Sequence, residues 1–543
     1  EVSTLIISAP RLLPQPSMNT WGVFAPLYAL RSRRMTGGAT LTELGELSKW
    51  AGSLGGGVVG TLPLLAGFTT EMTESSPYRP VSRRYWNELY VDIGSLPNLD
   101  DCAAAKELLA SPAFQHSAER LAAADHVDYQ SLMGHRRRIL SRMATHAWKT
   151  PSLRQQLDAF IDQRPELLDY ARFRTATSTW ESSWPNWDGA DFDGDLSGSS
   201  LPEEEIAYHV YAQWQFHEQM SNAAATAREH GPGLYLDLPV GVHPDGFDTW
   251  RDRAQLCVEL EAGAPPDDLN AGGQCWALPV LHPQQSRLAG HSHVRESVRA
   301  HLRYAGVLRI DHVMGLRRLF CIPRGASAAD GVYVRYPSQE LFATVAVETT
   351  RTNAIVVGED LGTVPDAVRE EMAEHGARGM FVGQFSFGGK MGSTMYQAPA
   401  GTVASFGTHD TPTFAGHARA TDLEIQQELG FIDDAGKSEA QRGRRDLLDY
   451  LARHFRAGSP DDDAALAAIH DGLLREMSDS DAWLVLVTLE DLWLESRTQN
   501  VPGTGPERDN WKRKLAHTLE DMGADAQLGD RLRRVFAGRS HSS

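Results

Sequence analysis

Short apolar segments that end in a carboxylate recur through the second half of the chain. Residues 307–311 read Val-Leu-Arg-Ile-Asp, which is the pattern of a buried strand that closes on an acid. The pattern returns in 354–360 and again in 402–410. An acid at a strand end can serve a turn, and it can also serve catalysis. Because it recurs on three separate segments, the catalytic interpretation is favoured.

Apolar segments of this kind predict eight strands, and most of them are followed by a helical stretch or a helical insertion. They lie near residues 23, 57, 234, 307, 354, 380, 403 and 484. Strands that alternate with helices form parallel sheets buried on both faces, so eight such units predict an α/β fold, a closed (β/α)8 TIM barrel. An open dinucleotide-binding sheet would carry a glycine-rich turn after an early strand, whereas Gly55-Gly56-Gly57 precedes its strand.

Composition divides the predicted barrel into five segments. They are an N-terminal segment with the first barrel strands (1–98), a mainly helical insertion (99–228), the barrel strands that carry the acids (229–417), a second helical insertion (418–480), and the last strand with a C-terminal helix (481–543). Residues 263–283 are rich in glycine, proline and aspartate, and they are predicted to form a loop.

Length, charge and cysteine usage limit the possible functions. The chain has 543 residues and a net charge of −19, which disfavours nucleic acid and anionic membranes as partners. No apolar run approaches the roughly 18 residues of a membrane helix, and no secretory signal is evident. The four cysteines are scattered without a Cys-x-x-Cys spacing, which disfavours a zinc site or a disulfide framework. A cytoplasmic protein is therefore expected.

Acids that end different strands of one barrel converge on the same mouth. Metal-assisted hydrolysis and glycosyl transfer both use such a cluster. A metal site would recruit histidines or closely spaced acids, whereas these acids come one per strand, with Arg309 and His409 competing against a cation. His291 and His293 lie two residues apart, but nothing nearby completes a site and exposed loop histidines are commoner than ligands. No metal or other cofactor is predicted.

Glycosyl transfer requires two carboxyls in opposed environments, an ionised nucleophile and a protonated acid. Asp311 stands two residues from Arg309, whose charge is expected to lower the pKa of Asp311. Glu359 ends the apolar Ile-Val-Val-Gly run, and burial there is expected to raise the pKa of Glu359. These environments make Asp311 the candidate nucleophile and Glu359 the candidate acid.

Sequence motifs surround these strand ends. The central ones are Arg-Ile-Asp-His-Val-Met-Gly, Val-Val-Gly-Glu-Asp-Leu-Gly and Phe-Gly-Thr-His-Asp, and the supporting ones are Ser76-Pro77-Tyr78, 236–241, 263–267, 273–276 and 500–504. In this order they resemble the 4-α-glucanotransferases (amylomaltase or disproportionating enzyme) of glycoside hydrolase family 77, in the α-amylase clan. The resemblance runs from about Gly22 to Lys514. It implies a barrel with helical insertions and without the C-terminal β-domain of amylases.

The resemblance also implies a retaining double displacement on α-1,4-glucans, with maltooligosaccharides as donor and acceptor. Asp311 would be the nucleophile, Glu359 the general acid/base, and Asp410 the group that stabilises the transition state. Arg309 would hold Asp311. The residues expected to contact substrate or to hold the nucleophile are Arg309, His409, Asp237, Tyr78, Trp276 and His312.

Two other functions stay open at this point. A hydrolase of the same clan would differ only in whether water or a sugar attacks the intermediate. For transfer, the loops near Tyr78 and 263–276 would have to exclude water. A non-catalytic glucan-binding barrel would lack at least one catalytic acid, whereas all three are present. The family often has Trp-Gly-Ile-Gly-Asp after strand one, where this chain has Arg-Met-Thr-Gly-Gly-Ala at 34–39. This difference bears on the preferred glucan length.

Overall fold

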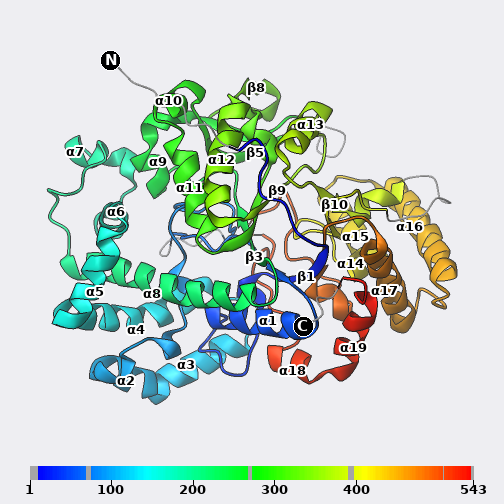
Figure 1. Cartoon of the computed structure of the whole chain (residues 1–543), viewed down its shortest axis with the longest axis horizontal. Coiled ribbons are helices and arrows are strands. Elements are labelled where there is room, and N and C mark those ends of the chain that lie inside the picture. Colours follow the sequence, from blue (N-terminus) through cyan, green and yellow to red (C-terminus); the bar gives the residue numbers. More distant parts are fainter. Residues whose placement is uncertain (1–9, 69–74, 267–271, 389–396, 506, 540–543) are drawn as a thin grey trace.

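The computed structural model describes residues 10–68, 75–266, 272–388, 397–505 and 507–539. Its centre is an eight-stranded parallel sheet in the order β10-β11-β12-β1-β2-β3-β6-β9 (Figure 1). The strands are β1 (Thr20–Phe24), β2 (Val58–Gly60), β3 (Gly233–Leu238), β6 (Ala305–Ile310), β9 (Ile355–Gly358), β10 (Met380–Val382), β11 (Val403–Ser405) and β12 (Leu484–Thr488). All eight predicted strands are confirmed, and so is the TIM barrel.

The sheet closes on itself between β9 and the residues just before β10. Val357 pairs with Arg378 in a parallel bridge. The Arg378 N–H donates to the Val356 carbonyl at 2.9 Å, and the Gly358 N–H donates to the Arg378 carbonyl at 2.8 Å. The segment before β1 lies across this seam, where Gln15 accepts a hydrogen bond from the Arg378 guanidinium. Closure therefore satisfies backbone groups that an open sheet would leave exposed at its edges.

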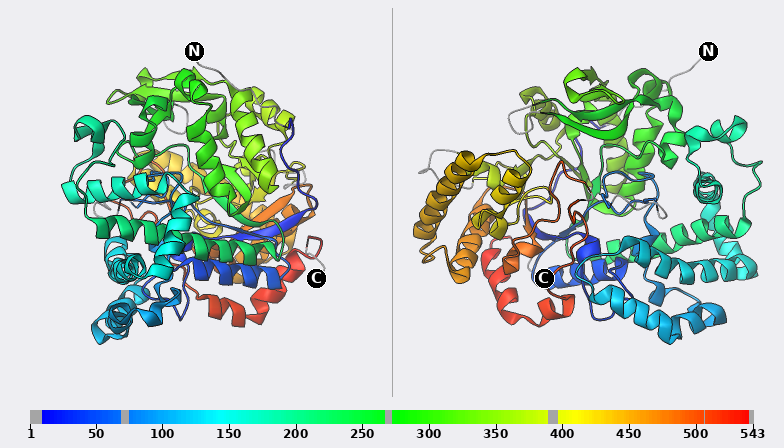
Figure 2. Two further views of the ribbon diagram at one scale, coloured as in Figure 1. Left: turned by 60° about the vertical axis from the view of Figure 1, so that its left-hand side comes forward. Right: turned by 180° about the vertical axis from the view of Figure 1, so that it is seen from behind.

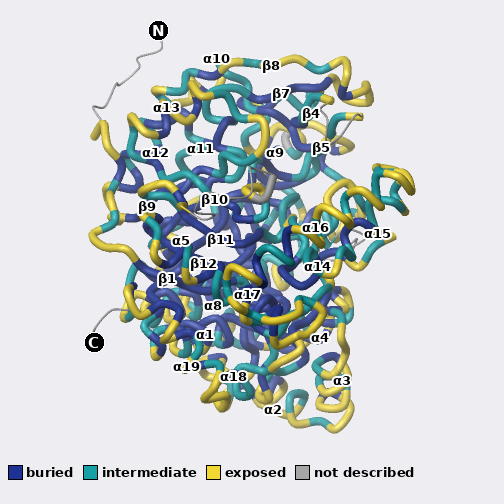
Figure 3. The backbone as a smooth tube through the Cα atoms, turned by 90° about the vertical axis from the view of Figure 1, so that its right-hand side faces the viewer, coloured by how far each residue is buried: buried dark blue, intermediate teal, exposed yellow. Residues whose placement is uncertain are grey.

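The barrel strands are apolar along their length because both of their faces are covered. All residues of β3 and β9 are buried, as expected where side chains fill the barrel and helices pack outside it. Two of those helices, α1 (Leu41–Ser53) and α8 (Glu203–Arg228), contact each other beside β2 and β3. Thr40 and Glu43 form a capping box that starts α1. Buried residues concentrate along these strands and helices (Figure 3).

Two groups of helices lie on opposite sides of the barrel (Figures 1 and 2). One group is α2 (Ala103–Ala110), α3 (Pro112–Ala123), α4 (Tyr129–Lys149), α5 (Pro151–Asp162), α6 (Leu167–Trp180) and α7 (Gly189–Phe192), and the other is α14 (Phe414–Ala418), α15 (Thr421–Glu428), α16 (Asp434–Phe455) and α17 (Asp463–Asp479). The remaining helices are α9 (Phe247–Arg251), α10 (Pro283–Leu288), α11 (Ser292–Leu302), α12 (Ser338–Thr352), α13 (Asp366–His375), α18 (Leu519–Ala524) and α19 (Ala526–Val535). The five-segment division of the chain stays a prediction.

A second, antiparallel sheet is a feature that the sequence patterns do not predict. Its order is β5-β4-β7-β8, with β4 at Leu256–Ala264, β5 at Gln274–Leu281, β7 at Arg318–Pro323 and β8 at Val332–Arg335. The loop expected over 263–283 is therefore wrong, because 274–281 is a strand paired with β4. Proline is tolerated at Pro279 because β5 is an edge strand. Asp267, part of one motif, lies outside the described residues.

The described residues also bear on the expectations for membrane helices and cysteines. No helix in the described part of the chain is long and apolar enough to cross a membrane. All four cysteines are free thiols, of which Cys102 and Cys321 are buried.

The tightness of barrel packing can be tested at Gly306 in β6. A Cβ atom there would lie 1.6 Å from the Pro232 carbonyl oxygen, so backbone would have to move. We expect Gly306→Ala to lower the free energy of unfolding by about 1–3 kcal/mol, measured as a lower Tm by calorimetry. The control is Gly134→Ala at an exposed position of α4, where a Cβ meets nothing within 4 Å and alanine should stabilise by about 0.5–1 kcal/mol. Equal effects at the two sites would contradict the packing described.

Candidate active site

The carboxyl ends of three barrel strands deliver the predicted acids to one mouth. Asp237 lies within β3, Asp311 follows β6 and Glu359 follows β9. Strand-like hydrogen bonding continues past the strand ends, since the Asp311 N–H donates to the Leu238 carbonyl and the Glu359 N–H to the Ile310 carbonyl, both at 3.0 Å. The backbone beside each acid is therefore fixed, which fixes where its carboxyl emerges.

A single guanidinium joins two of these acids. Nη1 of Arg309 donates to the two carboxylate oxygens of Asp237 at 2.6 and 2.8 Å. Nη2 lies 2.9 Å from Oδ1 of Asp311. The Arg309 and Asp237 side chains are 7% and 3% exposed, whereas the Asp311 side chain is 21% exposed. Of the three groups, Asp311 is thus the one that faces the open side of the site.

The pKa of Asp311 is raised to about 6, so the predicted lowering is wrong. Burial is the largest cause, and the charges of Asp237 and Glu359 add to it, while Arg309 acts in the opposite direction. Arg309 is shared with Asp237, so its charge does not belong to Asp311 alone. With a pKa of about 6, most of the Asp311 population is still ionised at neutral pH.

Both carboxylate oxygens of Glu359 accept a hydrogen bond from a backbone N–H group. The His312 N–H donates to Oε2 at 3.0 Å and the Leu361 N–H donates to Oε1 at 2.7 Å. Burial raises the pKa of Glu359, against the lowering effects of Arg309 and of these two hydrogen bonds. The direction is the one expected from its apolar strand, and it favours the protonated form.

Asp410 differs from Asp311 and Glu359 in having a lowered pKa. Its Oδ1 accepts a hydrogen bond from Asn500 Nδ2 at 2.7 Å, and its Oδ2 lies 3.3 Å from His409 Nε2. Burial would raise the pKa of Asp410, but the charge and hydrogen bond of His409, together with Asn500, hold it at about 2. Burial lowers and Asp410 raises the pKa of His409, and the net shift is upward.

Tyr78 connects the two halves of the site. Its hydroxyl donates to Asp237 Oδ2 at 2.7 Å and lies 2.8 Å from His409 Nε2. Its ring also stacks on the His409 imidazole, with centroids 5.2 Å apart and planes 18° apart, and Trp511 packs near both. Asp410, His409, Tyr78, Asp237 and Arg309 therefore form one continuous chain of contacts.

The second sheet contributes an aromatic wall. Trp276 of β5 meets the His312 ring edge-to-face, with centroids 5.1 Å apart. His312 takes a left-handed backbone conformation, with φ of 47°, immediately after Asp311. Burial lowers the pKa of His312, so its neutral form dominates at pH 7. Trp276 therefore packs on the residue that directly follows the candidate nucleophile in the chain.

All nine residues named from the sequence fall within this connected region, and two contributors were not named. Asn500 bonds Asp410, and Trp511 packs on Tyr78 and His409. The Asn-Val-Pro-Gly-Thr motif could have pointed to Asn500, whereas Trp511 carries no local signal. The exposure expected for His291 and His293 is wrong, since they are 5% and 2% exposed. Within the described ranges no group of three or more His, Cys, Asp or Glu could hold a metal.

Comparison with known proteins gives a consistent set of relatives. Residues 25–519 match the sequence model of the family described as 4-alpha-glucanotransferase. A 4-alpha-glucanotransferase of Mycobacterium tuberculosis is 32% identical over 544 residues, covering 94% of this chain and 74% of the relative. One of Haemophilus influenzae is 30% identical over 579 residues, covering 98% and 81%.

Solved structures share the architecture. The amylomaltase from Corynebacterium glutamicum superposes with a TM-score of 0.84 at 26% identity, covering 95% of this chain and 75% of that one. The amylomaltase from Streptococcus agalactiae, solved in complex with acarbose, superposes with a TM-score of 0.77 at 20% identity, covering 97% and 100%. At 20% identity, the similarity to the Streptococcus agalactiae protein shows a shared fold.

Asp491 offers a test of the electrostatics beside the site. It lies in the 3-10 helix that follows β12, and it accepts the Phe414 N–H at 2.7 Å. Burial raises its pKa to about 7, the Phe414 N–H opposes this and Glu490 adds to it. Because the folded pKa lies above the unfolded value of about 3.9, ionisation of Asp491 opposes folding increasingly as pH rises from about 4 toward 7.

We therefore expect Asp491→Asn, which keeps the acceptor and cannot ionise, to raise Tm by a few degrees at pH 8 and by almost nothing at pH 4. Calorimetry at the two pH values measures this. Asp162→Asn, an exposed position at the end of α5, is the control and should show no such pH dependence. The same offset at both pH values would show that the Asp491 charge is not the cause.

Proposed function

This chain belongs to the 4-alpha-glucanotransferase family, glycoside hydrolase family 77, and from that premise we propose how its site transfers α-1,4-glucan segments from a donor maltooligosaccharide to the 4-hydroxyl of an acceptor glucan or glucose. The observation that carries the proposal is the pair Asp311 and Glu359. They follow the neighbouring strands β6 and β9. Burial raises the pKa of both, but their partners differ, because Asp311 pairs with the Arg309 guanidinium whereas Glu359 is held by two backbone N–H groups.

In the first step Asp311 attacks the anomeric carbon of the donor. Its pKa of about 6 leaves it ionised at neutral pH, and Arg309 Nη2 fixes the oxygen that does not attack. Glu359 donates its proton to the departing glycosidic oxygen, which a raised pKa favours. The products are a glycosyl-enzyme ester on Asp311 and a shortened glucan.

In the second step the acceptor 4-hydroxyl attacks that ester. Glu359, now ionised, takes the hydroxyl proton, and the bond to Asp311 breaks. Two inversions at the anomeric carbon retain the α configuration. Since the backbone N–H groups of His312 and Leu361 hold both Glu359 oxygens, the same carboxyl is in place as acid and as base.

Asp410 stabilises the positive charge that develops on the sugar between these states. Its pKa of about 2 keeps it ionised throughout, and Asn500 and His409 orient it. The Asp410 side chain is 49% exposed, so its fixed negative charge is open to a bound sugar and can face the positive charge that develops there. Asp237 and His409, linked through Tyr78, bind sugar hydroxyls at the donor subsite.

The aromatic groups around the mouth favour a sugar over water as the acceptor. Trp276 packs on His312, the residue after Asp311, and Tyr78 with Trp511 covers the side of His409. The match of residues 25–519 to the 4-alpha-glucanotransferase family supports an α-glucan as the substrate class. A hydrolase of the same clan would share the acids and differ in this exclusion of water.

Product analysis with maltotriose alone distinguishes transfer from hydrolysis. Moving a maltosyl unit between two molecules of maltotriose yields glucose and maltopentaose, and repeated transfer yields longer maltooligosaccharides. We expect this ladder without added metal or nucleotide, measured by anion-exchange chromatography. Glucose and maltose without elongated products would identify a hydrolase instead.

The division of labour between the two carboxyls is tested by Glu359→Gln. An amide cannot donate a proton to a poor leaving group, so transfer from maltotriose should fall by about 10²–10⁴-fold. α-Glucosyl fluoride leaves without protonation, so its first step should survive and the glycosyl-enzyme on Asp311 should accumulate, visible by mass spectrometry of the quenched protein.

Glu370→Gln, on the exposed side of α13, is the control and should behave as the unmodified protein. If the Glu359 variant lost activity equally on both donors and formed no adduct on Asp311, Glu359 would not be the acid/base.

A further inference from the structure

The loop that follows β2 touches β3 and the turn after it at two points. At the first, the Tyr78 hydroxyl donates to Asp237 at 2.7 Å. At the second, Nη1 of Arg83 donates to the Pro239 carbonyl at 3.1 Å and to the Val240 carbonyl at 3.0 Å. The first contact lies in the active site and the second lies behind it, so the loop is held at both ends of one short span.

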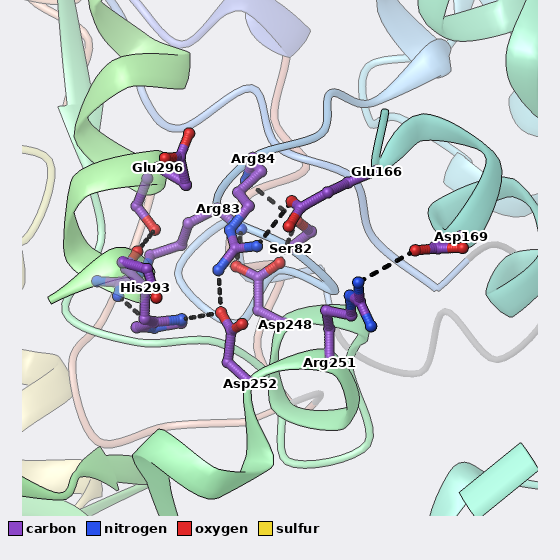
Figure 4. A network of polar contacts seen from close by, with 12 residues as sticks. Ser82, Arg83, Arg84, Glu166, Asp169, Asp248, Arg251, Asp252, His293 and Glu296 are labelled. Carbon is purple, nitrogen blue, oxygen red and sulfur yellow. Dashed lines mark hydrogen bonds and ion pairs between the residues drawn. The ribbon is translucent and has the colours of Figure 1, made fainter. Parts of the chain in front are cut away.

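The other terminal nitrogen of the Arg83 guanidinium joins a buried polar network (Figure 4). Nη2 lies 2.6 Å from His293 Nε2. Arginine can only donate, so Nε2 accepts, and Nδ1 of His293 carries the proton that it shares with Asp252 Oδ2 at 2.8 Å. Burial lowers the pKa of Arg83 to about 10, which still leaves it protonated at neutral pH. Arg83 is therefore a charged anchor with fixed partners.

The backbone beside Arg83 is fixed as well. Asp248 of α9 is fully buried and accepts the Arg83 N–H at 2.8 Å and the Ser82 hydroxyl at 2.5 Å. The neighbouring Arg84 pairs with Glu166 at 3.0 Å and with Asp252. Figure 4 shows these side chains converging from separate segments. Little freedom remains for the end of the loop that leads back to Tyr78.

The network reaches the wall behind the nucleophile. Arg83 and His293 line the same pocket, of about 90 Å³, as Asp311 and His312. Apart from these four residues, the lining is almost entirely apolar. No contact joins Arg83 to the site acids themselves among the interactions of the described residues. Any influence of Arg83 on the reaction must act through the position of its neighbours.

We propose that Arg83 is a positioning residue for glucan transfer: by tying the Tyr78 loop to the carbonyls of Pro239 and Val240, it places the Tyr78 hydroxyl between Asp237 and His409. The inference rests on the proposed roles of Tyr78, Asp237 and His409. Because one hydroxyl serves both partners, a small shift of the loop breaks both contacts and loosens the donor subsite.

A double-mutant cycle between Arg83→Met and Tyr78→Phe tests this proposal. Methionine keeps the buried stem and removes the donors. With maltotriose as substrate, we expect Tyr78→Phe alone to lower kcat/KM by about tenfold, the value of one hydrogen bond. In the Arg83→Met background the same change should cost less than about threefold, because the hydroxyl is already out of place.

Arg136→Met is the matched control for the loss of a buried arginine. Arg136 is also buried, also donates to two backbone carbonyls, those of Gly38 and Ala39, and also has its pKa lowered to about 10 by burial. It should lower Tm comparably and leave the tenfold effect of Tyr78→Phe intact. Arg83→Lys, whose ammonium can reach the same carbonyls, should restore part of the coupling. If Arg83→Met does not fold, Arg83→Gln, whose shorter side chain cannot span both carbonyls, takes its place in the cycle.

Three results would overturn the inference. One is a Tyr78→Phe effect of the same size with and without Arg83, and another is the same loss of coupling in the Arg136 control. The third is no effect of Tyr78→Phe on the unmodified chain, which would remove the role of the hydroxyl itself. A chain that formed no maltopentaose at all would contradict the proposed function, which is a separate outcome.

Discussion

Arg309 is a single cation buried among carboxylates, and the geometry of the site follows from how it is placed. Side chains two residues apart on a strand share a face, so Arg309 and Asp311 lie together at the end of β6. The register between β3 and β6 sets Asp237 directly opposite Arg309. The period of the strand and the register of the sheet therefore determine the ion pairs at 2.6 and 2.9 Å. Removing the guanidinium would leave buried charges unpaired, which is far more costly than the pair is stabilising.

One cation cannot neutralise every acid around it, so the pKa of each acid depends on which other partners it has. Asp410 has its own partners, His409 and Asn500, and its pKa is about 2. Asp311 shares Arg309 with Asp237, and burial raises its pKa to about 6. Glu359 has backbone donors and a buried position, with its pKa raised. The lowered pKa of Asp410 thus sets it apart from Asp311 and Glu359, and acids in different environments can take different roles in one reaction.

The sequence predicted the barrel because each strand is a local apolar run, and it predicted the acids because each one ends such a run. It did not predict the antiparallel sheet, since β5 contains Pro279 and lies wholly within the residues 263–283 that read as a loop. It also misjudged the pKa of Asp311, because only the fold shows that Arg309 is divided between two carboxylates. His293 reads as a loop histidine, yet its partner Arg83 stands 210 positions earlier. Pairings at such separations leave no periodic trace in a sequence.

Buried polar networks support the site from two sides. Behind Tyr78 lies the Arg83 network already described. Behind Asn500, the neighbouring Gln499 accepts from the Tyr28 hydroxyl and donates to Glu490, both at 2.8 Å, and Glu490 pairs with Arg513. The Trp511 N–H also donates to the Gln499 carbonyl at 2.8 Å.

Ion pairs of this kind add little net stability compared with a well-packed apolar core, because taking charges out of water offsets most of their attraction. What they provide is direction, since each hydrogen bond restricts where its partner can lie. Apolar packing alone would hold the loops around this mouth within a range of positions. Tyr78 and Asp410 have to meet partners at hydrogen-bond distance, so the loops that carry them depend on directional contacts that the barrel core cannot supply.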